Sequence, residues 1–112
     1  MKLKNLTHIE SLKILDQSNT PILAIDRSDA PKVRVRHHYE PIGSIDCNGA
    51  QIPIFDDVNT VLCLPEPAED AMVIVGPHEI RYIKDRDDVV SVGDLVTGEN
   101  RSIIGYRTLT VL

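Results

Sequence analysis

The stretch MVIVGPHEIRYIKDRDD, residues 72–88, joins a continuous apolar run to a charged, polar segment. The run at residues 71–75 predicts a strand covered on both faces, because a strand with one solvated face alternates apolar and polar residues. Gly76-Pro77 ends the run, and apolar residues then recur at helical spacing. A proline early in a helix costs little, since its missing N–H would be unpaired there in any case. The stretch therefore predicts an inner strand that turns sharply into two or three helical turns.

The chain before this strand predicts a series of short strands separated by turn residues. The cluster Asp16 to Asn19 lies between two strand-like runs and indicates a hairpin. The pair Asn48-Gly49 is a stronger hairpin signal, because both central residues of a type I′ turn need a positive φ. Pro53 cannot donate a ladder hydrogen bond, so we expect its strand at a sheet edge or with the proline nitrogen facing outward. We expect strands near residues 11–15, 21–25, 32–39, 42–47, 50–55 and 58–64.

The chain after residue 88 predicts a short strand and a further hairpin. Val89-Val90 forms the short strand, Thr97 to Asn100 the hairpin turn, and the last strand lies near residues 102–111. Strands therefore dominate the chain. We expect an α+β fold in a single domain of residues 1–112, with a mostly antiparallel or mixed β-sheet and one or two short helices. A small β-barrel-like domain is the alternative.

Length and composition narrow the class of protein. The 112 residues suffice for one core, and 42% of them are hydrophobic although the chain has no Trp and a single Phe. The first residues are too polar for a signal peptide, and no apolar run approaches the roughly eighteen residues that a spanning helix needs. Cys47 and Cys63 lack a metal-binding spacing, so we expect reduced, structural thiols. The expected location is the cytoplasm, which is the host cell cytoplasm if a phage encodes the protein.

The charge distribution excludes one class of partner and suggests another. A net charge of −5 argues against general nucleic-acid binding, which requires clustered Lys and Arg. The acidity is concentrated in residues 64–100, which carry nine acidic and three basic side chains. Such a surface suits an inhibitor that imitates or blocks an anionic partner of a host protein.

One predicted strand carries a row of basic side chains. The sequence KVRVRHHY at residues 32–39 alternates strictly, so Lys32, Arg34, Arg36 and His38 share one face. Guanidinium groups match phosphate oxygens in bidentate pairs, so this row can bind a nucleotide or another phosphate compound. The alternative is a solvated strand face, or charge that protects an exposed strand edge against aggregation.

The spacing of the histidines and carboxylates does not predict a metal or catalytic site. His37 and His38 are adjacent, so they point to opposite faces of a strand and cannot share a metal ion. We expect His37, on the apolar side, to be a buried neutral imidazole. Aspartates follow several apolar runs, where Asp usually closes a strand by bonding to turn amides, and a Mg²⁺ site at Asp56-Asp57 is the alternative. Since common catalytic and phosphate-binding motifs are lacking, we expect neither metal nor cofactor and name no catalytic residue.

Two further polar residues stand where anionic ligands often bind. Arg107 shares its parity with Leu109 and Val111, so it points inward and needs a carboxylate or an anionic ligand, unless Gly105 introduces a bulge. His78 lies at the predicted helix start, where free N–H groups favour anions. It is a candidate for phosphate binding or acid–base chemistry, and the alternative is an ordinary exposed position.

Three fragments resemble a group of small uncharacterised proteins of bacteriophages, prophages and other mobile elements. They are Asn-Leu-Thr-His at residues 5–8, Cys-Leu-Pro-Glu-Pro at residues 63–67, and DDVVSVGDLV with RSIIGYRTL within residues 87–109. The group looks as if it opens with Asn-Leu-Thr-Pro-His, whereas no proline stands between Thr7 and His8 here. The resemblance implies a phage-type origin rather than an activity.

The resemblance also suggests which polar residues to combine. If the first, inner and last strands neighbour one another, their polar residues form one pocket at a sheet end, where open sheets commonly bind ligands. This pocket combines Asn5, Thr7, His8, His78 and Arg107. With Arg34 and Arg36 of the basic row added, the predicted ligand-binding residues are Asn5, Thr7, His8, Arg34, Arg36, His78 and Arg107.

We therefore expect a small intracellular accessory protein of a phage or mobile element that binds a phosphate-containing ligand such as a nucleotide. Two alternatives stay open: a protein–protein inhibitor that acts on a host factor through its acidic surface, and a small phosphodiester hydrolase that uses His78 or His8. The exposed strand edge at residues 32–39 also favours homo-oligomers formed by strand pairing.

Overall fold

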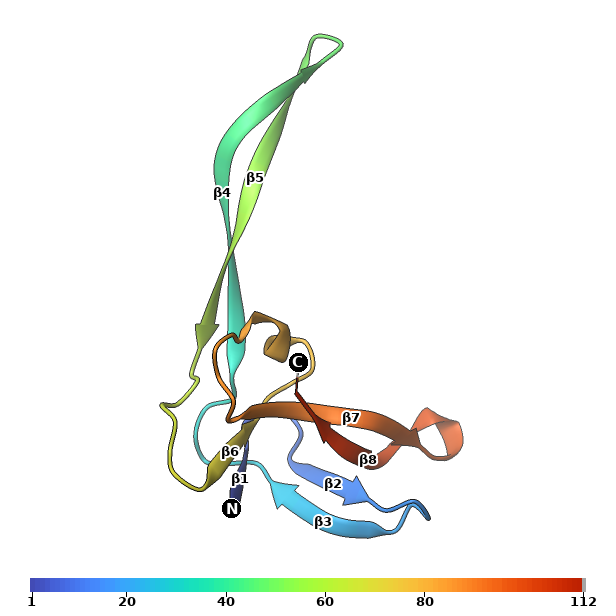
Figure 1. The fold of residues 1–112 in the computed structure, drawn as a ribbon. Helices are drawn as coiled ribbons and strands as arrows, with labels where there is room; N and C mark the ends of the chain where they lie inside the picture. The colour runs from blue at the N-terminus through green and yellow to red at the C-terminus, as the bar shows by residue number, and fades with distance from the viewer. Residues whose placement is uncertain (112) are drawn as a thin grey trace.

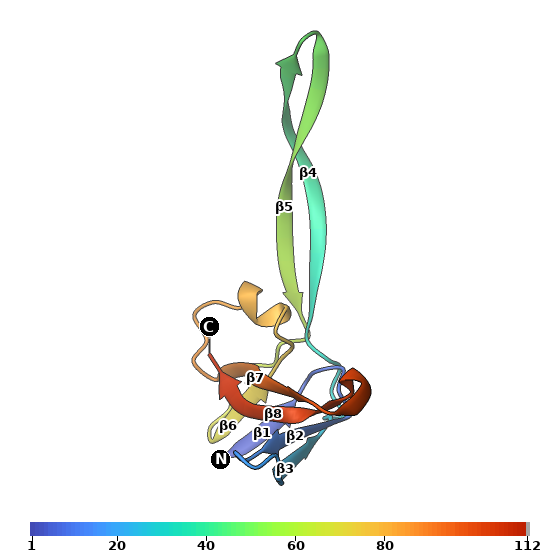
Figure 2. The ribbon, with the colours of Figure 1, turned by 90° about the vertical axis from the view of Figure 1, so that its right-hand side faces the viewer.

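A computed structural model describes residues 1–111, and its strands form one six-stranded sheet and one two-stranded sheet. The six-stranded sheet has the order β1-β6-β7-β8-β2-β3 and is nearly closed into a barrel. The two-stranded sheet, β4 with β5, projects away from it (Figures 1 and 2). The strands are β1 Lys2–Asn5, β2 Ser11–Leu15, β3 Pro21–Asp26, β4 Arg34–Cys47, β5 Ala50–Leu62, β6 Ala71–Ile74, β7 Val89–Thr97 and β8 Ile103–Thr110.

The fold is mostly β, which corrects the expected α+β class. Within residues 1–111 the helical segments are two single 3₁₀ turns, η1 (Glu79–Tyr82) and η2 (Glu99–Arg101). The helix expected after Pro77 stops after one turn, because Ile83 is already extended and Asp85 takes a positive φ of 60°. Its N-terminus also lacks a side-chain cap. The mixed sheet was predicted correctly, and the barrel-like alternative describes the body better than α+β.

The apolar run that precedes the corner forms the inner strand β6, as predicted. It lies between β1 and β7 and is parallel to both. Val73, and Val75 just beyond the strand, pack into one hydrophobic cluster, whereas Ile74 packs into a second cluster on the other face. Both faces of this strand are therefore covered, which explains why its sequence does not alternate.

Two predicted hairpins contribute the rest of the body. β2 pairs with β3 and β7 pairs with β8, both antiparallel, and β7 is longer than the two residues expected. The β7–β8 register shifts between Val96 and Thr97, which makes a bulge beside Gly105. A Cβ atom on Gly105 would lie 2.7 Å from the carbonyl oxygen of Lys13, so only glycine lets β8 approach β2 this closely.

The four strands expected between residues 32 and 64 are two long continuous strands, β4 and β5. Together they form a hairpin, called the arm below, whose turn is Asn48-Gly49 with φ values of 52° and 85°. The arm makes the molecule 62 Å long, with a radius of gyration of 18.7 Å. A compact chain of this length would have about 13 Å. Pro53 lies at a sheet edge as predicted, because both arm strands have an unpaired edge in the described structure.

The side chain of Asn5 connects the two ends of the six-stranded sheet. Asn5 is fully buried, and its Nδ2 donates to the carbonyl oxygens of Ile9 and Ile25 at 2.9 and 3.0 Å. Its Oδ1 accepts from the N–H of Thr7 at 3.0 Å and from the Thr7 hydroxyl at 2.6 Å. Ile25 belongs to β3 and Asn5 to β1, so one amide links both edge strands.

We predict that Asn5→Ala lowers the free energy of unfolding by about 2–4 kcal/mol, because it leaves buried backbone groups of Thr7, Ile9 and Ile25 without their partner. Urea unfolding followed by circular dichroism measures the loss. Asn59→Ala, at an exposed position on the arm, is the matched control and should change stability by less than about 0.5 kcal/mol. Equal stability of the two variants would contradict the role given to Asn5.

Candidate functional site

The predicted ligand residues near the N-terminus bind each other. Thr7 is buried, its hydroxyl donates to Asn5 Oδ1, and its hydroxyl oxygen accepts from the N–H of Ile9 at 3.0 Å. His8, next in sequence, is exposed. Asn5 and Thr7 thus use their polar atoms to close a tight connection after β1, and His8 alone of the three faces solvent.

Arg107 lies in another part of the molecule. One of its guanidinium nitrogens donates to Asn19 Oδ1 at 2.7 Å, and another lies 3.5 Å from Asp94 Oδ2. Its Nε is buried and has no hydrogen-bond partner within the described residues. The arginine is half-buried and joins the β2–β3 turn to β7 through its two terminal nitrogens, one of them to the exposed carboxylate of Asp94.

The remaining predicted residues lie on or beside the arm. Arg34 and Arg36 are exposed at the base of β4, and neither forms an ion pair within residues 1–111. His78 lies at the start of η1, which contacts both arm strands. The seven predicted residues are therefore spread over separate places. The single pocket was proposed for Asn5, Thr7, His8, His78 and Arg107, and the structure places these at the turn after β1, at η1 and beside the β2–β3 turn.

A small aromatic cluster attaches the arm to the body. The ring centroids of His37 on β4 and Tyr82 on η1 lie 5.5 Å apart, and His78 lies 5.6 Å from Tyr82 and 6.3 Å from His37. His37 Nδ1 lies 3.3 Å from Asp57 Oδ1 on β5. The expectation of a buried imidazole was wrong, because this face of β4 meets a one-turn helix that covers only part of it.

Metal-ligating side chains do not gather at this cluster or elsewhere in residues 1–111. No group of three His, Cys, Asp or Glu side chains is placed to hold an ion there. Asp56 and Asp57 are adjacent on a strand and so point to opposite faces. Over the same residues, no helix has the length and apolar character to span a membrane.

The arm changes its apolar face halfway along its length. Directly opposed residues of an antiparallel pair share a face. Between the base of the arm and residue 41, the pairs Val35 with Val61 and Pro41 with Phe55 place apolar side chains on one side. The register then shifts by one residue at Ile42, which is a β-bulge. Beyond the bulge the other side becomes apolar.

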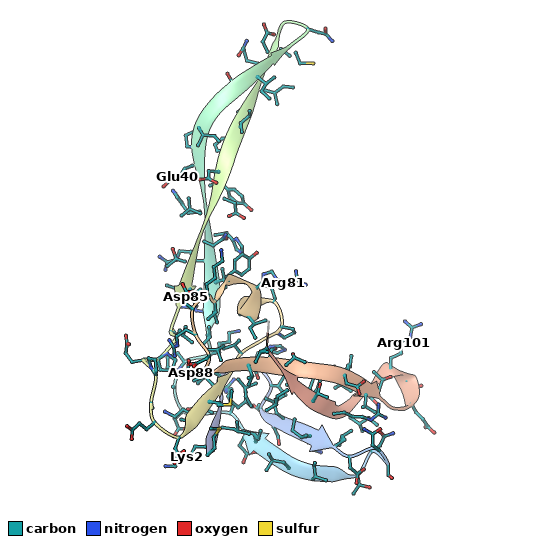
Figure 3. All side chains as sticks on the ribbon, viewed as in Figure 1. Lys2, Glu40, Arg81, Asp85, Asp88 and Arg101 are labelled. Atoms are coloured by element: carbon teal, nitrogen blue, oxygen red, sulfur yellow. The ribbon has the colours of Figure 1, made fainter. Side chains whose placement is uncertain are left out.

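We call this second side the apolar arm face. Ile45 opposes Ile52 and Gly43 opposes Ile54, whereas Asp46 opposes Gln51 on the polar side. Ile45 is 56% exposed and Ile52 is 49% exposed, although each belongs to a residue type that is usually buried. Side chains project from both sides of the arm with no other element near its outer half (Figure 3). The face consists of Ile45, Cys47, Ala50, Ile52 and Ile54.

The outer arm is also uniformly acidic. Residues 40–57, called the distal arm below, carry four carboxylates and no Lys or Arg. Glu40 and Asp56 oppose each other across the strands, on the same side as the apolar arm face. Like charges in this position destabilise a sheet unless a cation neutralises them. The distal arm thus has an apolar surface with a carboxylate pair at its base.

The acidic segment predicted as a contact surface, residues 64–100, contains a bidentate ion pair between two of its own residues. Arg86 donates from Nε to Asp88 Oδ1 at 2.7 Å, and from Nη2 to Asp88 Oδ2 at 2.8 Å and to the Pro65 carbonyl at 2.9 Å. These hydrogen bonds lower the pKa of Asp88 below its ordinary value and raise the pKa of Arg86. Asp88 therefore anchors the loop after β5, whereas Asp85 and Asp87 remain exposed.

Surface hollows do not coincide with the predicted ligand residues. One, of about 630 Å³, follows β3 and has a lining of mixed charge. A second, of about 370 Å³, lies between the edges of β1 and β3. Neither is lined by any of the seven predicted residues. The first is lined by Glu10, Asp26, Arg27, Ser28, Asp29, Ala30, Pro31 and Lys32.

Comparisons with known proteins add no identification: no family model matches the chain, and neither the curated proteins nor the solved structures contain a significant match. The geometry of the arm and the body therefore carries the functional argument.

We predict that Asp88→Asn lowers stability at neutral pH by about 1–3 kcal/mol, because it removes a charge-assisted bidentate pair. The pKa of Asp88 is depressed in the folded protein, so its contribution is complete above the ordinary carboxyl pKa of about 4 and disappears as the pH falls further. Unfolding curves measured across this range should converge for wild type and variant at acid pH. Asp87→Asn, exposed and adjacent, is the control, and a pH-independent difference for Asp88→Asn would argue against the ion pair.

Proposed function

We propose that this protein is an assembly protein that docks onto a neighbouring copy of itself through its arm. The apolar arm face carries the proposal, because it exposes Ile45 and Ile52 far from the body's hydrophobic clusters. Neither cluster includes any residue of the distal arm. The arm thus presents apolar surface that the rest of the described chain does not cover.

Sheet energetics support a docking role for the arm. A two-stranded hairpin is marginally stable by itself in water and gains from a third strand or a covering layer. Both arm strands also present an unpaired edge, which is a template for pairing with another chain. Exposed apolar surface on a strand pair of this kind usually marks a protein interaction site. A bound subunit would supply both the cover and the missing ladder partner.

The proposal assigns a specific role, docking into an assembly, to the accessory protein that was expected from the sequence. A phage or mobile-element protein acting in the host cytoplasm would use the arm to join an assembly rather than to turn over a substrate. Homo-oligomers formed through strand edges were one of the partner classes expected from the sequence, and the arm gives them a structural basis. Docking onto a host factor through the exposed aspartates of residues 64–100 is the alternative partner class.

We predict that wild-type protein self-associates in a concentration-dependent manner and that Ile45→Thr/Ile52→Thr weakens this association about 10–100-fold. The substitution removes apolar contact area and keeps β-branched side chains, so the hairpin itself should persist. Sedimentation velocity over a concentration series gives the association constant. Ser44→Thr/Gln51→Thr, on the polar side of the same strand segments, is the matched control and should assemble as wild type does. A wild-type protein that stays monomeric up to its solubility limit would refute the proposal.

A second candidate function keeps the phosphate ligand expected from the sequence. Its supporting observation is that Arg34 and Arg36 share a face of β4, are exposed, and oppose the neutral residues Leu62 and Thr60. Two guanidinium groups without carboxylate neighbours suit a phosphate group. This candidate places the ligand at the base of the arm, away from the apolar arm face.

We predict for this candidate that millimolar nucleoside mono- or diphosphates raise the melting temperature of the wild type, because a ligand that binds the folded state stabilises it. Arg34→Ala/Arg36→Ala should abolish the shift, and Arg101→Ala, on the distant η2 turn, should preserve it. Differential scanning fluorimetry measures all three proteins. An unchanged wild-type melting temperature with every nucleotide would remove the phosphate candidate and leave the assembly proposal untouched.

A further inference from the structure

The six-stranded sheet does not close completely. β1 and β3 are its two end strands, and the ladder between them consists of one isolated bridge from Asn5 to Arg27. Away from this bridge the two strands leave a hollow of about 370 Å³, called the seam below. The seam is lined by Met1, Leu3, Leu23, Ala24, Ile25 and Asp26. It is a gap in a sheet, and its lining is mostly apolar.

Both strands direct backbone groups into the seam. Lys2 N–H donates to the Asp70 carbonyl and Leu6 N–H donates to the Ile74 carbonyl, so the even-numbered residues of β1 face β6. Alternation then turns the N–H and C=O of Leu3 toward the seam. On the opposite side of the seam, Arg27 N–H donates to the Glu10 carbonyl. The backbone N–H and C=O groups of the odd-numbered residues of β3 therefore point toward β2.

The same alternation turns the backbone of Ala24 toward the seam from the β3 side. The register assigns no strand partner to Leu3 or Ala24 on this side within the described residues. The seam therefore offers hydrogen-bonding edges as well as apolar side chains. These are the two features that a strand from another chain requires for β-augmentation.

Charge and length match the seam to the distal arm. Lys2 and Lys4 are exposed on β1 beside the seam and outnumber the one carboxylate of its lining, Asp26. The distal arm carries four carboxylates and no Lys or Arg. Lysines beside the seam would neutralise the opposed pair Glu40 and Asp56 at the edge of the apolar arm face. β3 has six residues, which span about 20 Å, and the arm strands beyond the bulge have a similar length.

The positions of arm and seam exclude contact within one molecule. The arm extends from one side of the body, and the N-terminus with the start of β1 lies on the opposite side in both ribbon views (Figures 1 and 2). Figure 3 shows the same separation between Glu40 on the arm and Lys2 at the far side of the body. An arm and a seam placed at opposite ends favour a head-to-tail contact between copies.

We infer that the seam binds the distal arm of a second copy of this chain. The apolar arm face packs on Met1, Leu23 and Ala24, which are the exposed apolar residues of the seam lining. An arm strand adds to β1 or β3, and the lysines of β1 neutralise the arm carboxylates. This inference rests on the proposed docking role of the arm and names the surface of the second copy that receives it. Because the contact is head-to-tail, repetition produces a ring or a filament rather than a closed dimer.

Two variants test the arm and the seam separately. The arm variant is Ile45→Thr/Ile52→Thr, which keeps the seam. The seam variant is Lys2→Glu/Lys4→Glu/Leu23→Thr, which keeps the arm. A third variant, Lys84→Glu/Arg101→Glu/Ile103→Thr, makes the same charge change and the same kind of apolar loss at exposed positions away from the seam. Circular dichroism and thermal melting confirm that all three are folded.

The expected result is that the arm variant and the seam variant are each monomeric, whereas their mixture forms a 1:1 heterodimer that does not grow further. Size-exclusion chromatography with light scattering measures the masses, and the third variant should assemble as wild type does. If the seam variant assembles like wild type while the arm variant does not, the seam is not the acceptor and the docking role of the arm still stands. If wild type itself is monomeric, both proposals fail.

Discussion

The hydrogen bonds of the buried Asn5 amide are the constraint on which the rest of the structure depends. They hold the end of β1 against β3, although these strands are the two ends of the sheet order. Burying an amide without partners costs several kcal/mol. The four hydrogen bonds therefore favour the arrangement in which the end of β1 lies against β3. The segments that follow are fixed as well, because Ser28 N–H donates to the Asn5 carbonyl and Val33 N–H to the Leu6 carbonyl. Arg34 begins the arm directly after this anchor.

The sequence predicted the local elements whose causes are local. Asn48-Gly49 and the Asp16 to Asn19 cluster form the expected turns, and residues 71–75 gave the doubly covered strand. The prediction of a longer helix after Pro77 was wrong because the three-residue spacing of Ile80 and Ile83 fits one 3₁₀ turn as well as an α-helix. The long arm was divided into four strands because the predicted strands stop before Glu40-Pro41 and before Asp56-Asp57, and proline and aspartate commonly end strands. In a two-stranded arm each strand has a free edge, where a proline deprives no neighbour of a hydrogen bond.

The candidate site was harder to predict because its cause is tertiary. Asn5 and Thr7 carry the polar groups expected of a ligand site, but their two-residue spacing also suits side-chain hydrogen bonds that close a turn, and the structure has that arrangement. Strand parity placed His37 with Val35 correctly, yet parity does not reveal how little of that face η1 covers. The isoleucines near Asn48-Gly49 were visible as strand residues. Their exposure depends on the distance between the arm and the body, which no sequence pattern encodes.

The bulge at Ile42 gives the clearest reason to regard the apolar arm face as selected rather than incidental. Without the extra residue, β4 would place Ile45 on the side of Asp57 and Phe55, and Asp46 would join Ile52 and Ile54. One inserted residue therefore aligns Ile45 with the isoleucines of β5 and moves Asp46 to the polar side. A bulge interrupts the ladder and weakens a hairpin that already lacks neighbours. Such a cost on an exposed arm is offset if a bound subunit covers the face that the bulge creates, and the open edge between β1 and β3 has the chemistry to do so.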